Sequence, residues 1–195
     1  MTKNIIYGGW FRKQIVGEYK PAKAQKAHLQ GKPYRLVIAE NPENPDCFLE
    51  IGASVIHVGF IDELKRLCLM CYFSTELSGR LFLNTADYPE YEGDTDHVIK
   101  RTQFVFTAEG QFNIVTIEGK TNDFRDNITT IRRAKEPIDV SYLWADYPAF
   151  GDYDALIAIA TLFPKRLQEV NFYKKYEFEE PLVWDREQSR YVPPQ

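Results

Sequence analysis

Short apolar or alternating runs, separated by turn-forming residues, dominate the first two thirds of the chain. Such runs, rich in β-branched and aromatic side chains, are typical of β-strands. Short Gly-containing links, such as AEGQ between TQFVFT and FNIVTI, predict hairpins and hence an antiparallel meander. Ser78-Gly79 and Glu109-Gly110 occupy two of the predicted turns. The predicted strands cover residues 34–39, 47–51, 55–60, 66–73, 80–83, 103–107, 112–117 and 128–131.

The pattern changes after Asp139. Residues 155–163 carry no charge and follow Asp152 and Asp154, either of which is a suitable N-cap. This predicts a buried helix packed on the sheet. Pro164 either ends this helix or opens a second one. The predicted fold is therefore α+β, mainly an antiparallel β-meander sheet with C-terminal helices packed on it.

We expect residues 1–195 to form a single domain, in which residues 176–195 are an extended C-terminal tail held by Phe178, Trp184 and Tyr191. The chain of 195 residues is 44% hydrophobic and 14% aromatic, as in ordinary globular proteins. It contains no apolar window of about 18 residues, and its first residues do not resemble a secretory signal. With only three cysteines, we expect a cytoplasmic protein with reduced thiols and no membrane partner.

Charge is distributed unevenly. Residues 1–35 contain eight basic residues and one acid, a net charge of +7, whereas the remaining 160 residues have a net charge of −11. We interpret residues 20–32 as a solvated lysine-rich loop, with a functional basic patch as the alternative. Aromatic residues interleave with the N-terminal lysines, as in nucleic-acid-binding segments. The acidic remainder would repel a phosphate backbone, so we expect no nucleic-acid partner.

The segment ADYPEYEGDTD, residues 86–96, holds five carboxylates and two tyrosines without a basic residue. Its order around Gly93 does not match a calcium-binding loop, because His97 and the residues after it provide no closing acid. Two carboxylates can also serve glycoside hydrolysis when a defined distance separates them, so a hydrolase using residues 87–96 is the alternative function. We predict no metal site and no cofactor.

Other catalytic motifs are absent from the sequence, which contains no Gly-x-Ser-x-Gly elbow, no His-Glu-x-x-His pair and no phosphate-binding glycine loop. Cys68 and Cys71 lie three positions apart in a predicted strand, so their thiols should diverge and act as core residues. We interpret His57 as a hydrogen-bonded sheet histidine. No residue is predicted to be catalytic.

The letters ADYP recur at Ala145, in ADYPAFGDYD. The flanking sequences of the two copies differ, so a duplication is not indicated. Because proline fixes φ and Asp or Gly tolerates turn geometry, we expect both copies to form turns.

Four segments together resemble small β-rich immunity proteins of bacterial polymorphic-toxin systems: GGWF at 8–11, LEIGASVIHVGFID at 49–62, FLNTADYPEYEGDTDHV at 82–98 and WADYPAFGDYDALI at 144–157. The resemblance implies a non-enzymatic cytoplasmic inhibitor that binds a cognate toxin domain and occludes its active site. It implies no particular oligomeric state. A basic toxin groove would be complemented by an exposed acidic, aromatic loop. The predicted partner-binding residues are Asp87, Tyr88, Glu90, Tyr91, Glu92, Asp94 and Asp96.

Besides this inhibitor and the hydrolase, we consider a structural or adaptor module. A sugar or small-molecule hydrolase should hold these carboxylates in a concave pocket and raise the pKa of one of them. An inhibitor should present them in solvent, and an adaptor should pack them on the basic N-terminal segment.

Overall fold

The computed structural model describes residues 4–41, 43, 45–119, 127–168, 176–185 and 189–194, and describes 162–168 by backbone alone. In this part of the chain, twelve strands form one sheet and two more form a separate hairpin. The strands of the large sheet are β1 Asn4–Ile6, β4 Tyr34–Ala39, β5 Cys47–Ile51, β6 Val55–Ile61, β7 Leu67–Thr75, β8 Leu81–Tyr91, β9 Val98–Phe106, β10 Phe112–Glu118, β11 Ile128–Arg133, β12 Trp144–Ala145, β13 Leu182–Asp185 and β14 Arg190–Val192. The hairpin consists of β2 Gly9–Phe11 and β3 Gln14–Val16.

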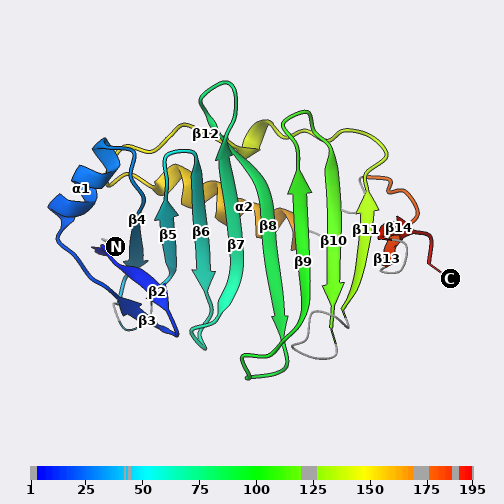
Figure 1. The fold of residues 1–195 in the computed structure, drawn as a ribbon, viewed down its shortest axis with the longest axis horizontal. Coiled ribbons are helices and arrows are strands. Elements are labelled where there is room, and N and C mark those ends of the chain that lie inside the picture. Colours follow the sequence, from blue (N-terminus) through cyan, green and yellow to red (C-terminus); the bar gives the residue numbers. More distant parts are fainter. Residues whose placement is uncertain are drawn as a thin grey trace.

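Strands β4 to β11 lie side by side in chain order and pair antiparallel (Figure 1). The fold is thus a β-rich α+β fold built on a meander, and all eight predicted strands are present. Strand β8 is much longer than the predicted 80–83. Its second half pairs with β9, and its pairing with β7 ends where Met70 faces Asp87. Pro89 is tolerated because β7 no longer pairs at that position.

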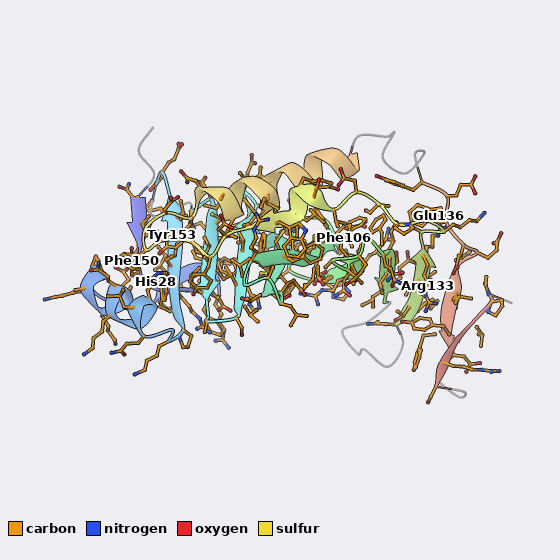
Figure 2. The ribbon with its side chains drawn as sticks, turned by 90° about the horizontal axis from the view of Figure 1, so that it is seen from above. His28, Phe106, Arg133, Glu136, Phe150 and Tyr153 are labelled. Carbon is orange, nitrogen blue, oxygen red and sulfur yellow. The ribbon has the colours of Figure 1, made fainter. Side chains whose placement is uncertain are left out.

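One face of the sheet is covered by α2, Asp154–Gln168, which lies along it in Figure 2. Leu156 and Ala160 are fully buried there among the inward-facing residues of the strands. The helix begins one residue before the predicted 155–163 and continues through Pro164. We call the opposite face of the sheet the open face, because no helix in the described residues lies over β6 to β10 on that side (Figure 1).

Residues 20–32 do not form the loop that we expected. Helix α1, Pro21–Leu29, lies at the β4 end of the sheet. Pro21 stands in the first turn, where its fixed φ suits a helix and its missing N–H costs nothing. Ala24 is buried in the core, so the lysines point to solvent while one small residue anchors the helix. Because a single buried alanine among lysines gives no amphipathic pattern, the sequence did not predict this helix.

The C-terminal residues that we expected in an extended tail contribute strands. β13 pairs with β11, and β14 pairs with β13, so that these two strands extend the sheet beyond β11 (Figure 1). Phe178 packs edge-on against Phe112 of the core, with ring centroids 5.8 Å apart. Trp144 is half-buried, and its ring centroid lies 4.9 Å from that of Phe82. A short 3-10 turn, Ser141–Leu143, precedes it.

The two ADYP segments adopt different structures. Ala86 to Pro89 lie inside β8, so the expected turn is wrong for the first copy. The second copy begins at the end of β12 and continues as irregular chain, turning at Gly151 with a φ of 88°. Cross-strand partners decide the outcome, because the first copy lies between two strands and the second has none beyond Ala145.

Candidate functional site

Asp87 is the buried member of the acidic segment. It lies in β8 on the open face, between Met70 of β7 and Gln103 of β9, and is 3% exposed. Its Oδ1 accepts no hydrogen bond from the described residues, and Arg101 Nη1 lies 3.7 Å from Oδ2. Burial raises the pKa of this carboxyl above its usual value, although Arg101 and Gln103 oppose the shift.

A polar row crosses the open face beside Asp87. Arg35, Glu50, His57 and Tyr72 face one another across four adjacent strands. Glu50 accepts a hydrogen bond from Arg35 Nε at 2.8 Å. Its other carboxylate oxygen is hydrogen-bonded with His57 Nδ1 at 3.3 Å. The His57 ring meets Tyr72 edge-on at 4.9 Å. His57 is therefore the hydrogen-bonded sheet histidine that we predicted. The row was missed because its members are far apart in the sequence and only the strand register aligns them.

The β8–β9 turn carries Glu92, Asp94 and Asp96, all exposed. Arg66 holds this turn: its Nη1 donates to the carbonyl oxygens of Gly93 and Thr95, each at 2.8 Å. The same guanidinium donates to the Asp62 carboxylate at 2.8 Å. One half-buried arginine thus fixes the backbone that displays the three acids.

Three of the five predicted carboxylates already have a cation of the same chain beside them. Asp87 lies near Arg101, Glu90 lies 3.1 Å from Lys100, and Asp96 lies 2.6 Å from Lys13. Across the described part of the chain, no ion pair or hydrogen bond is found for the carboxylates of Glu92 and Asp94. These two are the acids best placed to meet an external cation.

Both predicted tyrosines are engaged within the fold. Tyr88 lies on the face opposite Asp87 and packs edge-on against Phe104, with ring centroids 5.7 Å apart. The Tyr91 hydroxyl donates to the Leu67 carbonyl oxygen at 2.7 Å, and the Arg66 guanidinium lies 4.4 Å from its ring centroid. The exposed loop that we predicted over residues 87–96 is therefore wrong for 87–91, which belong to β8, and holds only for the turn that follows.

Within the described ranges, no group of three or more His, Cys, Asp or Glu side chains is arranged to hold a metal ion. Cys71 is fully buried and Cys68 half-buried, and burial raises the pKa of both thiols. Neither of these cysteines forms a disulfide, and Cys47 does not form one either. Thiols held in the protonated state are poor nucleophiles and poor ligands.

An aromatic cluster joins the second ADYP segment to α1 and β4. His28 Nδ1 lies 2.9 Å from the Tyr34 hydroxyl, which lies 3.1 Å from the Tyr153 hydroxyl. Tyr7 stacks on Phe150 at 5.4 Å, and burial with neighbouring tyrosines raises the pKa of Tyr7 to about 12. Figure 2 shows His28, Phe150 and Tyr153 gathered at one end of the molecule. The sequence did not indicate this cluster.

Two surface pockets lie away from the acidic segment. One, of about 570 Å³, lies at the end of β10 and β11 and is lined by Asn113, Arg133 and Glu136 among others. Arg133 and Glu136 lie at the opposite end of the molecule from His28 (Figure 2). The other, of about 470 Å³, lies between the β2–β3 hairpin, α1 and β4. Neither pocket is lined by a residue of the acidic segment, so neither places residues 87–96 in the concave site that the hydrolase hypothesis for this segment expects.

Comparison of the chain with protein-family models, with curated proteins and with solved structures finds no match in any of the three. None of the helices in the described part of the chain combines the length and the apolar character needed to cross a membrane.

Proposed function

We propose that the protein is a non-enzymatic inhibitor that binds a basic protein partner, as an immunity protein binds a cognate toxin domain. In this proposal it acts in the cytoplasm of a bacterium and blocks the active site or substrate groove of its partner. The supporting observation is the β8–β9 turn, where Glu92 and Asp94 are exposed without a partner in the described residues.

The backbone of this turn is held by hydrogen bonds, which favours binding. Arg66 fixes the Gly93 and Thr95 carbonyls, and the Glu92 N–H donates to the His97 carbonyl at 2.9 Å. A turn that is already ordered loses little conformational entropy when a partner binds. Exposed carboxylates at its tip act mainly on the rate of encounter with a positively charged surface.

The test is the association rate with the basic protein encoded by the adjacent gene, measured at several salt concentrations. The double variant Glu92→Gln/Asp94→Asn should slow association about tenfold at low salt, and added salt should reduce the difference. The control Glu109→Gln/Glu136→Gln removes the same two charges at exposed positions elsewhere. Equal rates for both double variants and the parent protein would remove the turn from the interface.

A hydrolase is the second candidate, and the raised pKa of Asp87 favours it. A general acid needs a carboxyl whose pKa is raised above its ordinary value, and Asp87 lies on the open face beside Arg101. Its side chain is only 3% exposed, however, so access for a substrate would require neighbouring side chains to move. Turnover of a glycoside or ester that disappears in Asp87→Asn, with the fold intact, would establish this candidate over the inhibitor.

A further inference from the structure

The pocket between the β2–β3 hairpin, α1 and β4, which we call the N-terminal pocket, has preformed walls. Val16, Ala27 and Pro33 provide apolar surface, and Tyr19 and Tyr34 provide two aromatic rings. Its volume of about 470 Å³ lies within the range that accommodates small molecules.

The two rings have fixed positions. The Tyr19 hydroxyl donates to the Arg35 carbonyl at 2.8 Å and accepts from the Arg35 N–H at 2.8 Å. The Tyr34 hydroxyl is 2.9 Å from His28 Nδ1 and 3.1 Å from the Tyr153 hydroxyl. Since its hydroxyl is already hydrogen-bonded, the half-buried Tyr19 ring offers a ligand its apolar surface, whereas Tyr34, only 5% exposed, supports the pocket as a buried lining residue.

The charge at the N-terminal pocket is positive. Lys23 and Arg35 line it, and no acidic side chain is among the described residues that do. Residues 19–39 contain five basic residues and no acid. Lys23 Nζ lies 5.5 Å from the Tyr19 ring centroid. Arg35 Nε forms an ion pair with the Glu50 carboxylate, with an N–O distance of 2.8 Å. Within the described ranges, the two terminal nitrogens of Arg35 and the ammonium of Lys23 have no hydrogen-bond acceptor, so they are donors for an anion.

Two glycines shape the site. Gly9 lies against the Arg35 side chain, where an added Cβ would be 3.3 Å from Cδ, so its lack of a side chain gives Arg35 room. Gly17 leaves the mouth open, because nothing lies within 4 Å of the position a Cβ would take, and its φ of 62° favours glycine.

We propose that the N-terminal pocket binds a small organic anion with a flat apolar body and a single carboxylate or phosphate group. The apolar walls take the flat body, and Lys23 and Arg35 take the charged group at the rim. Mostly apolar pockets with a few convergent polar groups are the usual form of small-molecule sites. This inference is independent of the proposed inhibitor function, which uses the β8–β9 turn.

Four probes test the proposal: benzoate, phenyl phosphate, neutral benzyl alcohol and inorganic phosphate, each titrated into the full chain and followed by amide NMR shifts. Benzoate or phenyl phosphate should saturate with about millimolar affinity and shift the amides of Tyr19, Lys23 and Arg35. The tighter of the two identifies the preferred charged group. Benzyl alcohol and inorganic phosphate should each bind at least tenfold more weakly, since each lacks one half of the ligand.

Matched variants separate a site from a general charge effect. Lys23→Gln should weaken binding about tenfold, because it removes a charged donor at the rim. Lys26→Gln removes the same charge from the same helix at a position that does not line the pocket, and should change affinity by less than about twofold. Ala27→Leu should fill the pocket and abolish binding. Equal effects of Lys23→Gln and Lys26→Gln, or no saturable binding of either anion, would overturn the proposal.

Discussion

Lys13 Nζ lies 2.6 Å from Asp96 Oδ1, so the β2–β3 hairpin contacts the β8–β9 turn directly. The basic N-terminal segment and the acidic segment, separate in the sequence, thus meet in the fold. A structural or adaptor role for the acidic segment predicts such a contact. How strongly the pair is coupled therefore distinguishes this role from partner binding.

We predict a weak coupling between Lys13 and Asp96. Both side chains are well exposed, at 41% and 64%, and water screens such pairs. A double-mutant cycle of Lys13→Gln and Asp96→Asn, measured by urea unfolding, should give a coupling of about 0.2–1 kcal/mol that declines with salt. A coupling above about 2 kcal/mol would favour the structural role.

We predict that Asp87→Asn stabilises the protein at pH 7. The buried carboxylate has an oxygen without a hydrogen bond, and the amide has nearly the same shape without the charge. The free energy of unfolding should rise by roughly 1 kcal/mol in urea titrations. Asp87→Leu, which also removes the charge, controls for shape. A loss of stability in Asp87→Asn would show instead that the ion pair with Arg101 outweighs the cost of burial.

The pH dependence of this effect has a defined sign. Because the folded-state pKa of Asp87 is raised above the ordinary 3.8, the protonated carboxyl favours the folded state. The contribution of Asp87 to stability should be fully present below pH 3.8 and be lost as the pH rises through the folded-state pKa. The stability advantage of Asp87→Asn should accordingly be small in acid and grow toward neutral pH.

We predict that Arg66→Lys loosens the β8–β9 turn. A lysine ammonium cannot reproduce the planar fork that reaches Asp62 and the two turn carbonyls together. Stability should fall by about 1–2 kcal/mol, and amide hydrogen exchange at residues 93–97 should accelerate. Arg80→Lys is the matched control, since Arg80 is half-exposed and pairs with exposed Asp146. Equal losses in both variants would contradict a special role for Arg66.

We predict that Tyr34→Phe destabilises the aromatic cluster. The change removes the hydroxyl that lies between His28 and Tyr153, and leaves the Tyr153 hydroxyl, in a residue only 2% exposed, without this partner. The free energy of unfolding should decrease by about 1–3 kcal/mol. Tyr19→Phe provides a comparison at a less buried hydroxyl. No change in Tyr34→Phe would mean that the cluster is held by ring packing alone.

Local chemistry in the sequence was sufficient to predict the presence of β4 to β11 and two of the hairpin turns between them. The short apolar runs of β4 and β5 predicted their bounds, because such a run bounded by turn-forming residues is a local feature of the sequence. Gly79 and Gly110 mark hairpin turns with φ of 78° and 90°, where other residues are strained. At Gly110 a Cβ would lie 2.5 Å from the Ile138 carbonyl oxygen, so glycine is also required by packing.

The sequence by itself determined a meander of β-strands, a late apolar helix and the presence of a dense acidic segment. Only the tertiary structure decided where those acids lie. Register between β7, β8 and β9 buries Asp87 on the open face, and the β8–β9 turn exposes Asp94. Likewise, the contact of Lys13 with Asp96 depends on where the hairpin rests. Local periodicity cannot carry this information, because burial and charge pairing depend on strands and loops distant in the chain.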